Sequence, residues 1–176
     1  MHAATPDARD ARDTRDGLGR ALDRLSRLAV GIAATSLIGL VVVQGWQVFA
    51  RYVLNNSPSW TEPVTLLLLA SAMGLGAAAG VREQRHFGFF LLAESLGRGG
   101  KRLARALSAT VMLAIGACIA TWSGILLFDG WDVRLAGAPL PQSINFLPLA
   151  LGGAMVTLFA LDALRQAWRG PLEGEA

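Results

Sequence analysis

Long apolar runs alternate with short polar segments along this chain. Four runs contain no Asp, Glu, Lys or Arg, and they cover residues 28–50, 63–81, 106–128 and 135–161. A helix of about 20 apolar residues crosses a hydrocarbon core of about 30 Å, because each residue adds about 1.5 Å to its length. Each run is long enough to span a membrane, so the pattern predicts four transmembrane helices. For the last run we place the helix at about 144–163, so that it begins inside the run and ends two residues after it.

The composition supports a membrane protein. Of the 176 residues, 53% are hydrophobic and 16% are charged, whereas a soluble domain carries about 25% charged residues. The alternative, four helices buried inside a large soluble core, would leave too few charged residues to cover that core with a polar surface. The predicted fold class is therefore an all-α integral membrane protein.

Two polar tails flank the predicted membrane domain, which extends over residues 18–168. The first tail, residues 1–17, alternates acidic and basic side chains and has few apolar residues, so it cannot bury enough surface to become ordered. It is predicted to be a disordered tether, and residues 169–176 form the second tail. A secretory signal peptide would place its apolar region near the start of the chain, so we expect the first span to be retained.

The connection between the second and third spans contains the segment FGFFLLAESLG, residues 87–97, which is too short to cross a membrane. It is rich in Phe and Leu, and a basic cluster follows it at residues 98–105. This pattern is typical of an amphipathic interfacial helix, with aromatic side chains toward the lipid and basic neighbours near anionic headgroups. A re-entrant segment packed on a partner is the alternative. Membrane lipids are therefore expected partners.

Basic residues are distributed unevenly among the connections. Fourteen of the sixteen Lys and Arg residues lie before the first span, in the second connection or after the fourth span, whereas the other two connections hold only Arg51 and Arg134. Cytoplasmic flanks of membrane proteins collect Lys and Arg. Both termini and the middle connection are therefore predicted to be cytoplasmic. The basic residues have no interleaved aromatic residues for stacking on bases, so we expect no nucleic-acid partner.

Three of the spans carry small residues at a spacing of four, which places them on one helix face. In lipid, small residues promote helix association because they let backbones approach closely. The stripes are Gly31, Thr35 and Gly39; Ala72, Gly76 and Gly80; and Gly116, Ala120 and Gly124. Packing within this chain and docking to a second membrane protein both explain such stripes, and the sequence leaves the choice open.

The middle of each span lacks the ionisable side chains that catalysis or ion transport would need. No Asp, Glu, Lys, Arg or His lies there, although a carrier acting alone needs ionisable groups or broken helices near the midplane. Haem and metal sites need several His or Cys residues, and this chain has only His2, His86 and Cys118. We therefore predict neither an enzyme nor a cofactor. Asp162, at the end of the fourth span, is expected to pair with Arg165.

The stretch NNSPSWTEPV precedes the second span. Pro63 suits a first helical turn, where its missing N–H would have no partner, and the Glu62 carboxylate interacts favourably with the positive end of the helix dipole. Ser59 or Glu62 is the expected N-cap, and Trp60 is of a type that lies at membrane interfaces. Arg51, at the end of the first span, is a candidate ion-pair partner for Glu62.

The series VFARYVLNNSPSWTEP, GLGAAAG and VREQRHFGFFLL resembles the small-permease subunit of tripartite ATP-independent periplasmic (TRAP) transporters, over about residues 22–168. That family has an Arg after the first span, a Trp-x-Glu at the second, glycines within it and a His after its basic end. By resemblance, the candidate subunit-interface or structural residues are Arg51, Trp60, Glu62, Gly76, Gly80 and His86. The family often has a second acidic residue directly after the glutamate, where this chain has Pro63.

The resemblance implies a subunit of a sodium-coupled secondary transporter for organic acids in the bacterial inner membrane. Its expected partners are a large transmembrane permease subunit, which carries solute and sodium, and a periplasmic solute-binding protein. This chain would be a scaffold for the large subunit and would help to dock the binding protein. Two alternatives come from other classes: a membrane anchor or assembly subunit of a respiratory enzyme, and a small self-sufficient channel.

Overall fold

Four long helices and one short 3₁₀ helix form the protein in the computed structural model, which describes residues 7–56, 58–83, 98–134 and 141–169. In chain order these elements are α1 (Asp7–Tyr52), α2 (Thr61–Arg82), α4 (Arg98–Asp129), η1 (Gln142–Phe146) and α5 (Leu147–Arg169). Each long helix, with η1 counted as the start of α5, contains a segment long and apolar enough to cross a membrane. The four predicted spans lie inside these segments, which confirms the all-helical class and four helices able to span a membrane.

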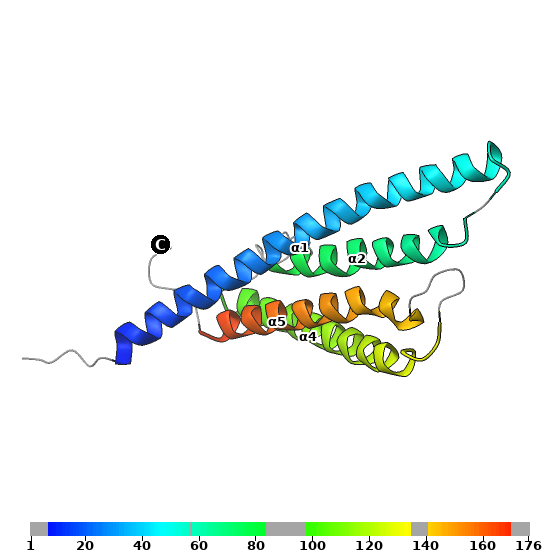
Figure 1. Ribbon diagram of the computed structural model, residues 1–176. Helices are drawn as coiled ribbons and strands as arrows, with labels where there is room; N and C mark the ends of the chain where they lie inside the picture. Colours follow the sequence, from blue (N-terminus) through cyan, green and yellow to red (C-terminus); the bar gives the residue numbers. More distant parts are fainter. Residues whose placement is uncertain (1–6, 57, 84–97, 135–140, 170–176) are drawn as a thin grey trace, which may run out of the picture.

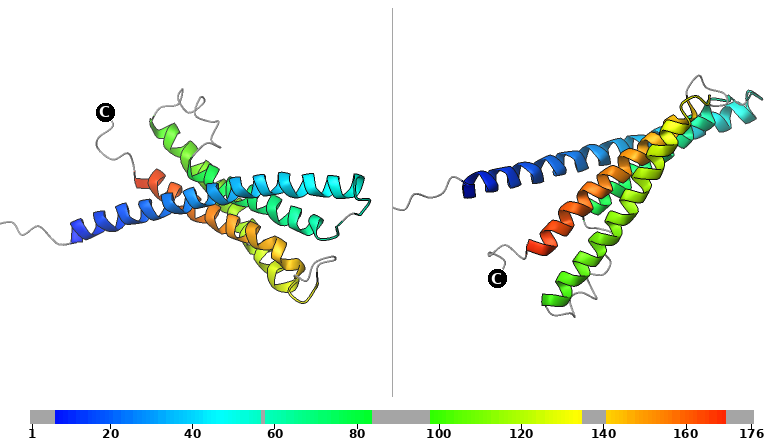
Figure 2. Two further views of the ribbon diagram at one scale, coloured as in Figure 1. Left: turned by 45° about the horizontal axis from the view of Figure 1, so that its top comes forward. Right: turned by 90° about the horizontal axis from the view of Figure 1, so that it is seen from below.

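The long helices run alternately up and down (Figure 1). α1 packs on α2, α2 packs on α5, and α5 packs on α4, so α1 and α4 lie at the two edges. The starts of α1 and α4 and the ends of α2 and α5 lie at one end of the molecule, here named the terminal end. The opposite end, named the loop end, carries the end of α1, the start of α2 and η1. Figure 2 shows α1 splaying away from α4 and α5 toward the terminal end.

Alanines and a few large apolar residues line the helix contacts, while many other large apolar side chains point outward. The buried residues form two clusters. The first joins α1, α2 and α5 and consists of Leu22, Ala78, Val81, Val156 and Phe159. The second joins α1 and α2 and consists of Ala29, Ala33, Leu75 and Ala79. Large Leu, Ile and Val side chains on α1 and α4 are exposed, as expected for helices whose solvent is lipid and whose association depends on close packing.

The start of α1 differs from the prediction. The helix begins at Asp7, so residues 7–16, expected to form a disordered tether, are helical. Elongating an existing helix adds one hydrogen bond for each residue fixed, whereas starting a new helix is unfavourable. The polar segment therefore continues a helix that the apolar segment already forms. Residues 1–6 and 170–176 lie outside the described residues, as do the predicted interfacial helix at 87–97 and His86.

Candidate functional site

Two consecutive glycines place α5 between α2 and α4. A Cβ atom added to Gly152 would lie 2.6 Å from the carbonyl carbon and oxygen of Gly74 on α2. A Cβ atom added to Gly153 would lie 2.6 Å from the backbone nitrogen of Ala120 on α4. Consecutive positions on a helix point about 100° apart, so each glycine allows close approach of a different neighbour. This pair is the central packing feature of the helix assembly, and the sequence stripes missed it.

The three predicted stripes divide between the two explanations left open by the sequence. On α4, a Cβ atom at Gly116 would lie 2.7 Å from Val156 of α5, and Ala120 lies against Gly153, so this part of the stripe packs within the chain, whereas Gly124 meets nothing within 4 Å. On α2, Gly76 faces Ala33 of α1 at 3.9 Å, and Gly80 is partly buried.

The stripe on α1 is largely unused inside the chain. Gly39 faces Leu68, but an added Cβ atom at Gly31 would meet nothing within 4 Å, and Thr35 is exposed. Gly45, outside the predicted stripe, also has open space at its Cα atom. Between residues 37 and 49, no residue of α1 is buried. At about 1.5 Å per residue, this leaves roughly 20 Å of apolar helix without close cover from the described part of the chain.

The motif at the loop end starts α2, but not with the predicted cap. The N-cap is Trp60 rather than Ser59 or Glu62, and its side chain makes no capping hydrogen bond. Instead, the Thr61 hydroxyl donates to the carbonyl oxygen of Pro58 at 2.8 Å, and Thr61 is fully buried. Glu62 lies in the first turn, as predicted. The turn before α2 therefore provides a hydrogen-bond acceptor for the buried Thr61 hydroxyl. The pattern of capping residues in the sequence did not predict this bond.

Arg51, Trp60 and Glu62 are all exposed at the loop end. Within the described residues, Arg51 and Glu62 form no ion pair with each other, so the predicted tie between the first two helices is absent. The backbone between them is tightened by Asn55, whose φ of 51° lies in the left-handed region that Asn tolerates. The Arg51 guanidinium and the Glu62 carboxylate are therefore both exposed at the loop end and do not pair with each other.

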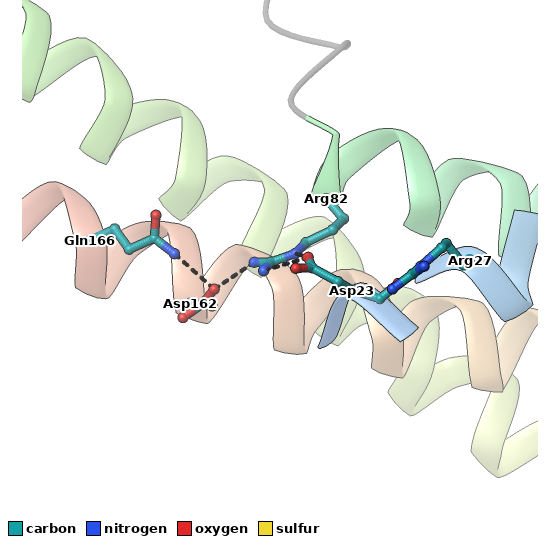
Figure 3. A network of polar contacts seen from close by, with 5 residues as sticks. All are labelled: Asp23, Arg27, Arg82, Asp162 and Gln166. Atoms are coloured by element: carbon teal, nitrogen blue, oxygen red, sulfur yellow. Dashed lines mark hydrogen bonds and ion pairs between the residues drawn. The ribbon is translucent and has the colours of Figure 1, made fainter. Parts of the chain in front are cut away.

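A three-helix ionic network lies at the terminal end (Figure 3). Nη1 of Arg82, at the end of α2, lies 2.6 Å from Oδ2 of Asp162 on α5. Nε and Nη2 of the same guanidinium lie 3.0 Å and 2.9 Å from Oδ1 of Asp23 on α1. The amide of Gln166 also donates to Asp162 Oδ2, at 2.9 Å. The Arg82 and Asp162 side chains are 18% and 17% exposed, so this contact is largely shielded from solvent.

The network corrects the predicted pairing of Asp162 with Arg165. Asp162 pairs with Arg82, and Arg165 is exposed. The sequence held a usable signal, because Asp23, Arg82 and Asp162 lie near the ends of three different apolar runs. In an up-and-down topology these three ends meet at the same side of the membrane. The planar guanidinium can then bind two carboxylates at once.

A second arginine joins α4 to the end of α5. The Arg102 Nε donates to the carbonyl oxygen of Ala167 at 2.9 Å, and its Nη2 donates to that of Trp168. The guanidinium also lies 6.0 Å from the centre of the Trp168 ring, within cation–π range. The last carbonyls of a helix have no partner inside the helix, and they carry its negative dipole end. Arg102 therefore caps α5 from a neighbouring helix.

We predict that Arg102→Gln loosens the last turn of α5. The loss of a charged cap is expected to destabilise the helix end by about 1 kcal/mol. Hydrogen exchange of the peptide amides near residue 168 should become about fivefold faster, because 1.4 kcal/mol corresponds to a factor of ten. Arg105→Gln is the matched control, since Arg105 is exposed on the same helix. Equal acceleration in both variants would show that the contact does not cap α5.

The described residues contain no group of three or more His, Cys, Asp or Glu that could hold a metal ion. The site features are instead packing and positioning elements: the α5 glycines, the ionic network, the exposed α1 face and the exposed loop end. Together they define a multi-pass membrane subunit with uncovered apolar and charged surfaces.

The comparisons with known proteins then identify the family. Residues 40–170 match the family model described as tripartite ATP-independent periplasmic transporters, DctQ component. The chain belongs to this family, and so it is the small permease subunit of a TRAP transporter. It is a transporter component rather than an enzyme, which also disfavours the alternative of a respiratory membrane anchor. None of the curated proteins compared with the sequence matches it.

Proposed function

We propose that this subunit scaffolds the large permease of its transporter and helps to dock the periplasmic solute-binding protein. Uptake would be coupled to sodium, the solute would be an organic acid, and the large subunit would carry both. The family match supports the transporter class. The observation that favours a scaffold is the lack of ionisable residues in the middle of the four spans, because transport sites need such groups or broken helices near the midplane.

The exposed face of α1 is the proposed contact with the large permease. Gly31 and Gly45 leave open space at their Cα atoms, and Thr35 is exposed between flanking apolar residues. Small residues of this kind permit close helix contacts in lipid. The stretch from residue 37 to residue 49 has no buried residue within the described chain. A second membrane protein packed there would complete the contacts that α1 lacks at the loop end.

The loop end is the proposed docking region for the binding protein. Arg51, Trp60 and Glu62 are exposed there, and neither charge has an ion-pair partner among the described residues. Both charges are thus available to a partner of complementary charge, which affects association rate and register more than affinity. By the family resemblance, His86 would contribute to a subunit contact, and Gly76 and Gly80 would set the α1–α2 spacing.

The proposed orientation places the terminal end in the cytoplasm. Basic residues gather at this end: Arg82 ends α2, and Arg98 to Arg105 occupy the first turns of α4. The loop end carries Arg51 and Arg134 alone among the Lys and Arg residues. The Lys and Arg asymmetry sets orientation in the bacterial inner membrane, and it directs Arg51, Trp60 and Glu62 toward the periplasm.

Co-purification in mild detergent tests the scaffold. The tagged chain is expected to retain the large membrane protein encoded beside it, and Gly31→Ile should reduce the retained amount at least tenfold, because the new side chain would prevent close helix approach. Gly124→Ile is the control, since an added Cβ atom at either position meets nothing within 4 Å in the chain itself. The α1 contact would be refuted if both variants retained the partner equally.

Arg51→Gln and Glu62→Gln test the loop end. Each should change the free energy of unfolding of the isolated subunit by less than about 0.5 kcal/mol, because exposed groups outside a network contribute little. Uptake that depends on the binding protein is expected to fall, with a higher binding-protein concentration needed for half-maximal rate. Arg134→Gln is the matched control at the same end. A normal concentration dependence in both variants would exclude these charges from docking.

A further inference from the structure

A polar cleft opens between α1 and the end of α2, at the terminal end. It is lined by Asp23, Ser26, Arg27, Arg82 and Glu83, and its volume is about 350 Å³. This volume falls at the lower end of the range of small-molecule sites, roughly 300–1,000 Å³, and is far above the roughly 30 Å³ that one water occupies in the liquid. The cleft can therefore hold a polar group with several heavy atoms.

The cleft lies at the depth of the lipid headgroups. The apolar run of α1 begins at Leu28, directly after Arg27, and the apolar run of α2 ends at Val81, directly before Arg82. Polar side chains at such positions meet the interfacial region of the bilayer. A lipid whose acyl chains lie along the first turns of the α1 apolar run, beside the proposed permease contact, would bring its headgroup to this opening, since Leu28 and Ile32 are 64% and 52% exposed.

The charges in the cleft favour a zwitterion over an anion. Its lining carries two arginines and two carboxylates, so an anionic or a cationic ligand gains no net attraction. Arg82 is already engaged by Asp23 and Asp162. Two groups of opposite charge remain available beside Arg82. The positive group is Arg27, with the Ser26 hydroxyl next to it, and the negative group is the second carboxylate oxygen of Asp23. A ligand with one negative and one positive group a few bonds apart matches this arrangement.

Ser26 and Arg27 form the anion side. Ser26 is 5% exposed, yet its hydroxyl makes no hydrogen bond to a described residue. Ser26 lines the cleft, so its hydroxyl can donate a hydrogen bond to a ligand oxygen there. The Arg27 Nε has one long contact, 3.4 Å to the backbone oxygen of Asp23, which leaves its terminal amino groups without a partner in the described chain. These donors suit a phosphate.

Asp23 forms the cation side. Its Oδ1 accepts both Arg82 contacts, at 2.9 Å and 3.0 Å, and its Oδ2 receives no hydrogen bond from a described residue. Figure 3 shows the Asp23 carboxylate meeting Arg82 on one side, with Arg27 on the other side of the same helix segment. The Asp23 side chain is 56% exposed. It can accept hydrogen bonds from a primary ammonium group.

We propose that this cleft binds the phosphoethanolamine headgroup of phosphatidylethanolamine, with the phosphate on Ser26 and Arg27 and the ammonium on Asp23 Oδ2. A bound lipid would fill the space between α1 and α2 next to the ionic network. It would thereby hold the angle at which α1 splays from the other helices.

Native mass spectrometry of the full chain released from mild detergent tests the proposal. The chain is titrated with phosphatidylethanolamine, phosphatidylglycerol and phosphatidylcholine, all with the same acyl chains. Phosphatidylethanolamine should bind about tenfold more tightly than the other two lipids. Phosphatidylglycerol has no ammonium group, and the quaternary ammonium of phosphatidylcholine has no N–H to donate to Asp23. The proposal would be overturned if phosphatidylglycerol or phosphatidylcholine bound as tightly as phosphatidylethanolamine.

Three variants localise the binding. Arg27→Gln should weaken phosphatidylethanolamine binding about tenfold and Ser26→Ala about fivefold, in line with the loss of a charged and a neutral hydrogen bond. Arg24→Gln is the control, because Arg24 is exposed on the same helix outside the cleft. Unchanged binding by Ser26→Ala and Arg27→Gln would place the lipid elsewhere. Free phosphoethanolamine that displaced the lipid at equal concentration would also contradict the proposal, since it would indicate a soluble ligand.

Discussion

Replacing Gly152 by Ala is expected to destabilise the isolated subunit strongly. The new Cβ atom would lie 2.6 Å from both the carbonyl carbon and the carbonyl oxygen of Gly74. These are backbone atoms of a second helix, so relief requires α2 and α5 to separate, rather than one side chain to turn. Overpacking of this kind lowers the free energy of unfolding by about 3 kcal/mol.

Unfolding in mixed micelles with increasing sodium dodecyl sulfate, followed by helical circular dichroism, measures this effect. Gly45→Ala is the matched control, because an added Cβ atom there meets nothing within 4 Å. Alanine has a higher helix propensity than glycine by up to about 1 kcal/mol, so the control should be neutral or slightly stabilising. Opposite signs for the two substitutions are the expected result. A loss of less than about 1 kcal/mol at Gly152 would contradict the close α2–α5 contact.

Replacing Arg82 by Gln is expected to cause the other large loss. Two carboxylates, Asp23 and Asp162, would lose their common partner. Asp162 is 17% exposed, so its charge would remain largely shielded and unpaired. Removing one partner of a fully buried ion pair costs about 3–5 kcal/mol, and partial exposure reduces the expected loss here to about 2–4 kcal/mol. The same denaturation experiment measures it.

Two further substitutions isolate the network. Arg165→Gln should change stability by less than about 0.5 kcal/mol, because Arg165 is exposed and the Asp162 pair is formed by Arg82. The double variant Arg82→Gln with Asp162→Asn should recover at least half of the loss, since it removes the unpaired charge together with its partner. A larger loss of stability for Arg165→Gln than for Arg82→Gln would instead support the pairing of Asp162 with Arg165 that the sequence suggests.

The start of α2 could be predicted from the local sequence pattern. Trp60, Glu62 and Pro63 were expected at the start of α2, and the structure places Trp60 at the N-cap and Glu62 in the first turn. The predicted Arg51–Glu62 pair is absent among the described residues, and the Asp162 partner is on another helix. The Asp162 error arose because spacing along the chain identifies neighbours on one helix, but not the neighbours brought by another helix. The Arg51–Glu62 error arose because closeness along the chain across a loop does not fix the distance between two side chains.

The sequence by itself determined that four helices cross a membrane, because run length and the absence of charge depend on no contact with the rest of the chain. It also pointed to the family, through motifs that lie in order between residues 48 and 92, and the family model matches residues 40–170. Only the tertiary structure decided which glycines pack, namely Gly152 and Gly153, and which stripe remains open on α1. Small residues face many directions on a helix, and the crossing geometry of neighbouring helices selects among them. In the same way, the folded arrangement brought Asp23, Arg82 and Asp162 together, because charges at the ends of different spans meet only once the helix order is fixed.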